Sequence, residues 1–126
     1  MESETVDGVE LETWTPQEVH DALAEGHIVL IDVRTPQEYM FEHVVGSLLM
    51  PMSFFAPHYL PSQGTKRIVL HCGSGVRSEK MARAAIAAGI DKIAHMGGGF
   101  GAWKEAKLPY MGTDMGTGAP SMVNPE

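Results

Sequence analysis

The chain has 126 residues, with nine Lys and Arg against sixteen Asp and Glu, and a formal net charge of -7. This length suits one domain, and the acidic balance argues against a non-specific nucleic-acid binder, which needs clustered positive charge. No apolar run is long enough to cross a membrane, and the acidic N-terminus lacks the apolar stretch of a signal peptide. We therefore expect a cytoplasmic protein that has neither nucleic acid nor membrane as its partner.

Cys72 is the one cysteine of the chain. It has no partner for an intramolecular disulfide, and zinc sites that need two or more cysteines are excluded by counting. The six histidines show no close metal-ligand spacing, so we expect no metal and no cofactor. In a reducing cytoplasm a lone thiol stays free for chemistry.

The sequence TPQE occurs at residues 15–18 and 35–38 and predicts two helix starts. In each, Thr caps a free backbone N–H, Pro suits the first helical position, and Glu completes a capping box. Between them, the apolar run at residues 27–33 predicts a strand that is buried on both faces. A second such run lies at residues 67–71, directly before the cysteine.

Two weaker strand candidates lie at residues 47–50 and 92–95. Residues 78–88 are rich in helix formers and predict a helix, and residues 100–106 predict a shorter one after three glycines. Because strands alternate with helices, we expect an α/β fold on a mostly parallel sheet.

We divide the chain into an N-terminal segment (1–12), one domain (13–110) and a C-terminal tail (111–126). The tail is made of Gly, Pro, Ser, Thr and Met without hydrophobic periodicity. Such a composition predicts a flexible segment.

Cys72 is the strongest candidate for chemistry, because it ends a predicted buried strand and opens a glycine-bearing loop before a helix. Ligands of parallel sheets bind at the carboxyl ends of strands. Glycines at 73 and 75 allow successive N–H groups to point inward, and the following helix adds a positive field. A thiol in that field has a lowered pKa and becomes a nucleophile. The alternative is an inert buried cysteine.

Three segments in register resemble rhodanese domains. Residues 68–78 (IVLHCGSGVRS) resemble their active-site segment, residues 31–47 resemble the region with the DVR motif, and residues 97–109 resemble the GG…W…LP ending. The resemblance implies a three-layer sandwich, in which helices flank a five-stranded, mostly parallel sheet. It also implies a sulfurtransferase, which takes sulfane sulfur from thiosulfate or mercaptopyruvate and gives it to cyanide or a thiol.

The resemblance assigns Cys72 as the nucleophile that carries a persulfide. Its stabilising loop comprises Gly73, Ser74, Gly75, Val76, Arg77 and Ser78. The ionic pair Asp32 and Arg34, together with His71, would support the site. Arg77 would also assist anionic donors with its planar set of N–H groups.

Departures from the family pattern leave the sulfur donor open. Many thiosulfate-using members have a basic residue after the cysteine, whereas Gly73 stands here, as in mercaptopyruvate sulfurtransferases. One alternative is a persulfide carrier or regulatory module that acts on a protein partner. Another is a cysteine-based phosphatase or arsenate reductase of the same fold. Those phosphatases place five residues between Cys and Arg, whereas residues 73–76 give a loop one residue shorter.

Overall fold

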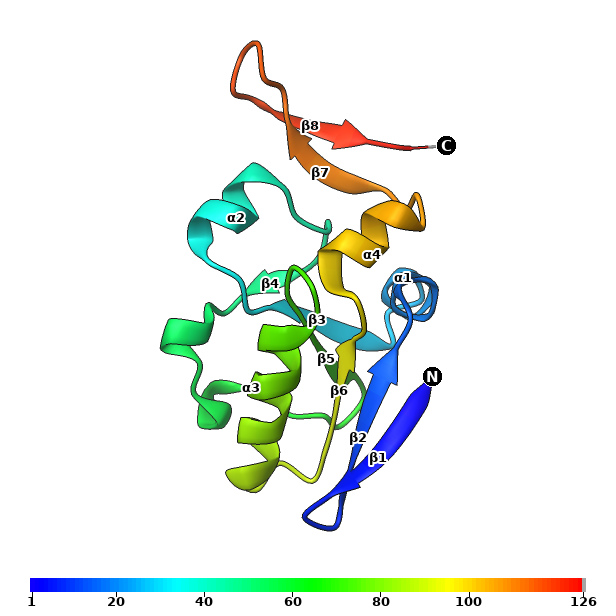
Figure 1. Cartoon of the computed structure of the whole chain (residues 1–126), viewed down its shortest axis with the longest axis vertical. Coiled ribbons are helices and arrows are strands. Elements are labelled where there is room, and N and C mark those ends of the chain that lie inside the picture. Colours follow the sequence, from blue (N-terminus) through cyan, green and yellow to red (C-terminus); the bar gives the residue numbers. More distant parts are fainter. Residues whose placement is uncertain (126) are drawn as a thin grey trace.

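The computed structural model describes residues 1–125 and shows a central sheet that helices cover (Figure 1). The strand order is β1-β2-β6-β5-β3-β4, in which β1 is antiparallel to β2 and all other neighbours are parallel. The strands are β1 (Glu2–Val6), β2 (Val9–Trp14), β3 (Ile28–Asp32), β4 (Leu48–Leu49), β5 (Arg67–His71) and β6 (Lys92–Met96). The helices are α1 (Pro16–Ala24), α2 (Pro36–Phe41), α3 (Val76–Ala87) and α4 (Gly99–Glu105), with two short 3-10 turns, η1 (Met52–Phe54) and η2 (Pro57–Tyr59).

The sheet buries apolar side chains on both of its faces. Successive side chains of a strand point to opposite faces, so Ile68 and Leu70 of β5 pack with Ala85 of α3. Val69, between them, packs on the other side with Trp103 of α4 and with α1. The layers are therefore helix, sheet and helix, which confirms the predicted α/β sandwich with five parallel strands.

β1 and most of β2 come from residues 1–12, the segment that we expected only to precede the domain, and neither strand was predicted. β1 and β2 form a hairpin whose turn is Asp7-Gly8, with positive φ angles of 50° and 78°. Asp-Gly is a favoured pair for such a two-residue turn, because both positions need positive φ. This signal was present in the sequence but did not enter the strand prediction.

Both TPQE sequences start helices as predicted. Thr15 and Thr35 accept a hydrogen bond from the N3 backbone N–H, and Glu18 and Glu38 accept one from the N-cap N–H in return. These reciprocal bonds satisfy N–H groups that a helix start otherwise leaves free. The second capping box places Glu38 beside the loop after Cys72, as described below.

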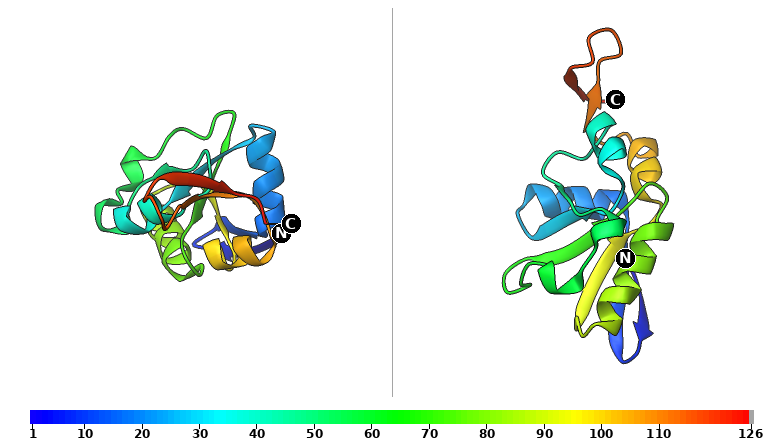
Figure 2. Two further views of the ribbon diagram at one scale, coloured as in Figure 1. Left: turned by 90° about the horizontal axis from the view of Figure 1, so that it is seen from above. Right: turned by 90° about the vertical axis from the view of Figure 1, so that its left-hand side faces the viewer.

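The C-terminal tail, which we expected to be flexible, contains regular structure in its described residues. β7 (Tyr110–Thr113) and β8 (Pro120–Val123) form an antiparallel hairpin, which projects from the end of the molecule where α2 and α4 lie (Figures 1 and 2). The Asp114 carboxylate accepts the backbone N–H groups of Gly116 and Thr117 and closes the turn. The Thr113 hydroxyl also donates to a carbonyl of α2. The hydrogen bonds of the Asp114 turn therefore support a hairpin in a segment that has no hydrophobic periodicity.

No helix among residues 1–125 is long and apolar enough to cross a membrane. The division at residues 12 and 110 stays a prediction.

Candidate active site

Cys72 follows directly after β5, and its residue is fully buried beneath the loop that leads into α3. The backbone N–H groups of Gly75 and Ser78 donate to its Sγ atom, at 3.1 and 3.4 Å. Gly75 has a φ of 100°, a left-handed conformation that L side chains rarely adopt. Gly75 thus lets the chain turn back over the sulfur as predicted, whereas Gly73, for which we expected the same, has no positive φ angle.

The surroundings of the thiol favour its ionised form. Burial raises the pKa of Cys72, but hydrogen bonds from Ser78, Ser74 and Gly75 together outweigh it, so the pKa lies below the ordinary thiol value. Oriented amides stabilise a negative sulfur without having to reorganise. A thiolate is the form in which a cysteine acts as a nucleophile, so these contacts agree with the expected chemistry of Cys72.

The three consecutive glycines hold this loop from behind. Gly98 and Gly99 have positive φ angles, and a Cβ atom on Gly99 would lie 2.5 Å from the carbonyl oxygen of Cys72. The N–H groups of Phe100 and Gly101 donate to the carbonyl oxygens of Cys72 and Gly73, at 2.8 and 3.0 Å. The glycines are thus needed for close approach of two backbone segments.

Gly99→Ala should destabilise the protein by about 2–4 kcal/mol, because a Cβ at a positive φ would also meet backbone atoms of the loop. Thermal unfolding would measure the loss. Gly101→Ala is the matched control, since its Cβ would lie 3.5 Å from the nearest atom and alanine favours the helix. Equal stability of the two variants would contradict the close-packing argument.

Arg77 pairs with Glu38. Its two terminal nitrogens donate to the two carboxylate oxygens, at 2.8 and 3.0 Å, and a third of its side chain is exposed. The same hydrogen bonds lower the pKa of Glu38 to about 2. The arginine that we expected to assist anionic donors is thus already held by an acidic partner, which links α2 to the start of α3.

Asp32 and Arg34 form the expected ion pair, and it is almost fully buried. The Arg34 guanidinium donates to both carboxylate oxygens and, at 2.7 Å, to the backbone carbonyl of Glu42. The pair therefore ties the end of β3 to the segment after α2. Among residues 1–125, neither Asp32 nor Arg34 forms a hydrogen bond with the Cys72 sulfur.

His71 is buried next to Cys72 in the chain. Its Nε2 atom lies 3.5 Å from the Asp32 carboxylate and forms no hydrogen bond among the described residues. Burial lowers the pKa of His71, with the Asp32 charge opposing the shift, and thus favours the neutral ring. Its position supports a structural role beneath the loop.

The sequence did not single out two side chains that the structure brings to the site, Glu38 and His95. Glu38 was noted as a capping residue and within the resemblance but without a role in the site, and His95 lies near the carboxyl end of the inner strand β6. Cys72 and His95 are both at the carboxyl ends of predicted parallel strands. This shared position could have indicated that the histidine lies near the cysteine.

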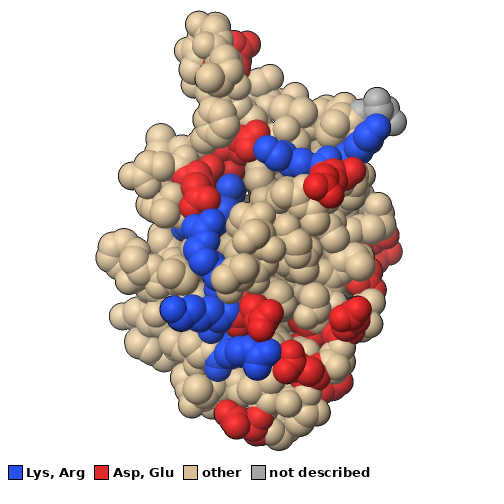
Figure 3. All heavy atoms as spheres, viewed as in Figure 1, with Lys and Arg blue, Asp and Glu red and all other residues tan. Residues whose placement is uncertain are grey.

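Basic side chains gather over α3 in one view of the surface, close to acidic ones (Figure 3). Both arginines of this helix are paired: Arg77 with Glu38, and Arg83 with Glu4 and Glu79. Neighbouring carboxylates therefore offset the positive charge of these side chains beside the loop. No group of three or more His, Cys, Asp or Glu in residues 1–125 is arranged to hold a metal ion.

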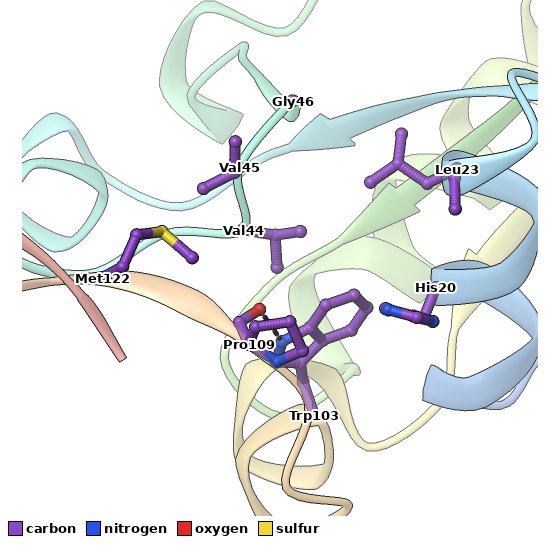
Figure 4. A pocket seen from close by; sticks show the side chains of 9 residues that line it. His20, Leu23, Val44, Val45, Gly46, Trp103, Pro109 and Met122 are labelled. Carbon is purple, nitrogen blue, oxygen red and sulfur yellow. Dashed lines mark hydrogen bonds between the residues drawn. The ribbon is translucent and has the colours of Figure 1, made fainter. Parts of the chain in front are cut away.

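An apolar pocket of about 330 Å³ lies away from Cys72, beneath the C-terminal hairpin (Figure 4). Trp103 forms part of its wall and donates its indole N–H to the Pro109 carbonyl at 3.0 Å. None of the loop residues 72–78 lines this pocket. It is therefore separate from the candidate active site.

A family model for the Rhodanese-like domain matches residues 15–106, so the chain belongs to the rhodanese-like family. The matched residues span the α/β domain from α1 to the end of α4 and include the cysteine loop.

Among its relatives is a probable adenylyltransferase/sulfurtransferase MoeZ of Mycobacterium tuberculosis, 38% identical over 79% of this chain but only 26% of that one. The thiosulfate sulfurtransferase GlpE of Haemophilus influenzae is 27% identical, over 75% of this chain and 90% of GlpE. The chain spans only part of the first relatives that it matches, 56% of one and 26% of another.

The solved structure of a rhodanese-related protein from Thermoplasma volcanium shares the fold. It has a TM-score of 0.68 and 21% identity, and the alignment covers 79% of this chain and 96% of that one.

Proposed function

We propose that this protein transfers sulfane sulfur and carries it as a persulfide on Cys72. The observation that carries the proposal is the pair of backbone N–H groups, from Gly75 and Ser78, that converge on the buried Sγ atom. Such a cradle stabilises a thiolate before the reaction and an anionic terminal sulfur after it. A reducing cytoplasm, in which a lone thiol persists, suits this chemistry.

The reaction proceeds in two displacements. The Cys72 thiolate attacks the outer sulfur of thiosulfate, a new S–S bond forms, and the old S–S bond breaks as sulfite leaves with the electron pair. A nucleophilic acceptor such as cyanide or a thiol then attacks the terminal sulfur. The product leaves as thiocyanate or a persulfide, and the Cys72 thiolate is restored.

Backbone atoms supply most of the recognition of sulfur in this proposal. Gly73 to Ser78 surround Cys72, while Ser74 and Val76 are exposed at the loop surface. A sulfur donor would therefore first contact the surface that loop residues 73–78 form. The side chain of Arg77 adds a positive charge at the edge of this surface. Mercaptopyruvate is the second donor that this cradle would serve, since it also delivers a sulfur and carries a carboxylate.

Arg77→Ala should raise the KM for thiosulfate about tenfold, which corresponds to about 1.4 kcal/mol of lost binding, and should change kcat little. The reason is that removal of the guanidinium also leaves the Glu38 carboxylate without its partner. The surface beside the loop then carries an unpaired negative charge, which repels an anionic donor. The measurement is thiocyanate formation from thiosulfate and cyanide, with mercaptopyruvate as the alternative donor.

Glu38→Gln is the matched control, because it frees Arg77 and should lower the KM for the same anionic donor. Unchanged kinetics in both variants would remove the pair from donor binding. If the wild-type protein forms no thiocyanate from either donor, the proposed catalytic function is wrong, and a carrier that needs a protein partner becomes the better hypothesis.

A further inference from the structure

A chain of polar side chains continues from the Cys72 sulfur into the interior of the sheet. The Ser78 hydroxyl lies 3.7 Å from Sγ and 3.1 Å from the Nδ1 atom of His95. The Nε2 atom of that imidazole lies 3.2 Å from the Thr13 hydroxyl. The row thus has four members: Cys72, Ser78, His95 and Thr13. Neither the family pattern nor the persulfide cradle explains why these side chains form a row.

The register of the parallel sheet produces the row. His95 pairs with Leu70 of β5 on one side and with Thr13 of β2 on the other. Ile93, two residues before His95 on β6, packs in the core beneath α3, so His95 also points to that face. Ser78 lies in the first turn of α3, directly above it.

The surroundings of His95 favour the neutral form of its imidazole. It is 4% exposed, and burial is the main reason that its pKa lies below the ordinary value. The charged groups that face it are Glu79 and Arg83 on α3 and Glu4 on β1, and Arg83 pairs with both carboxylates. A neutral imidazole has one N–H donor and one acceptor nitrogen. Its tautomer therefore decides which group donates and which accepts in each hydrogen bond of the row.

Two arrangements of protons run through the whole row, and both turn the Ser78 hydroxyl away from the Gly75 carbonyl, to which it can also donate at 3.3 Å. When Cys72 is a thiolate, the Thr13 hydroxyl donates to Nε2, the Nδ1–H of His95 donates to the Ser78 oxygen, and the Ser78 hydroxyl donates to Sγ. When Cys72 is a thiol, each bond runs the other way, and Nε2 carries the imidazole proton. Only the first arrangement gives the thiolate a side-chain donor in addition to the amides of the loop.

We propose that His95 is a positioning residue that acts through Ser78: its Nδ1–H tautomer turns the Ser78 hydroxyl toward the sulfur, and the tautomer changes when Cys72 ionises. In the change, Cys72 passes its proton to Ser78, Ser78 passes one to Nδ1 of His95, Nε2 of His95 passes one to Thr13, and Thr13 releases one. The net result is that the thiol proton is lost to water. This inference rests on the proposed function, because it names the group that keeps Cys72 ready to attack a donor.

Titration of the Cys72 thiol tests the coupling. The thiolate is followed by its ultraviolet absorbance and by the rate of alkylation at each pH, and the lone cysteine makes both signals specific. His95→Leu and Ser78→Ala should each raise the pKa of Cys72 by about one unit, the size expected for one lost hydrogen bond to a charged group. The double variant should shift no further than Ser78→Ala alone.

Two outcomes overturn the proposal. One is an unchanged thiol pKa in His95→Leu. The other is a shift of the same size in the wild-type and Ser78→Ala backgrounds, because His95 would then act by another route. His95→Asn serves as the conservative variant, since its amide can still donate to the Ser78 oxygen and should recover most of the shift.

The wild-type protein provides a test that does not depend on how the variants fold. The ¹⁵N NMR signals of the His95 ring should show the Nε2–H tautomer below the pKa of Cys72 and the Nδ1–H tautomer above it, with no such change in Cys72→Ser. One unchanged tautomer across the titration, or a charged ring at pH 7, would contradict the inference. Neither measurement needs a sulfur donor, so failure of sulfur transfer is recorded separately.

Discussion

Cys72→Ser should abolish the gain of about one sulfur mass that the wild-type protein shows when it is reduced and mixed with excess thiosulfate. Intact-protein mass spectrometry measures that gain directly, and cyanide should remove it. The serine hydroxyl fits the same cradle but is a much weaker nucleophile and does not form a persulfide. Because Cys72 is the lone cysteine, no other thiol gives a background signal.

The variant also separates chemistry from folding. Serine is nearly isosteric with cysteine, so the N–H groups of Gly75 and Ser78 keep an acceptor and the fold should survive, as circular dichroism would show. A sulfur adduct that persists in Cys72→Ser would sink the persulfide mechanism. A wild-type adduct formed from mercaptopyruvate but not from thiosulfate would keep the mechanism and change the donor.

Arg34→Met should destabilise the fold by about 3–5 kcal/mol, the usual cost of leaving one partner of a buried ion pair alone. Asp32 is fully buried and loses the side-chain donors that now lie 2.8 and 3.0 Å from its oxygens. The Glu42 carbonyl loses its donor as well. Thermal and chemical unfolding would measure the loss, with a fall in Tm of about 10 °C or more.

The double variant Asp32→Leu with Arg34→Met is the matched control. It removes both charges together, and buried pairs replaced by apolar side chains of similar size often cost little. We expect it to recover most of the stability that the single variant loses. If the single variant unfolds no more easily than the wild type, the pair does not hold β3 to the segment after α2.

The active-site loop could be predicted from the sequence because its signals are local. A buried strand, a cysteine, two glycines and a helix start follow one another within a dozen residues, and each limits the backbone by itself. The two capping boxes were readable for the same reason. The hairpins at both ends of the chain also had local turn signals, but hydrophobic periodicity was given more weight than Asp-Gly or Asp114.

The partners across the site could not be predicted in this way. Glu38 meets Arg77 across 39 positions of sequence, and Thr13 meets His95 across 82. Such contacts depend on strand order and register, which a single sequence with short parallel strands leaves open. The predicted role of Arg77 was incomplete for this reason, since its acidic partner lies on a different helix.

The two edge strands of the sheet affect the tendency of the protein to aggregate at high concentration. β1, at one border, carries the exposed carboxylates Glu2 and Glu4, and β4, at the other, is two residues long. A charged border and a very short one are both poor templates for the strand of another molecule. β5, which leads to Cys72, lies well inside these borders. Strand-to-strand aggregation is thus discouraged at both edges.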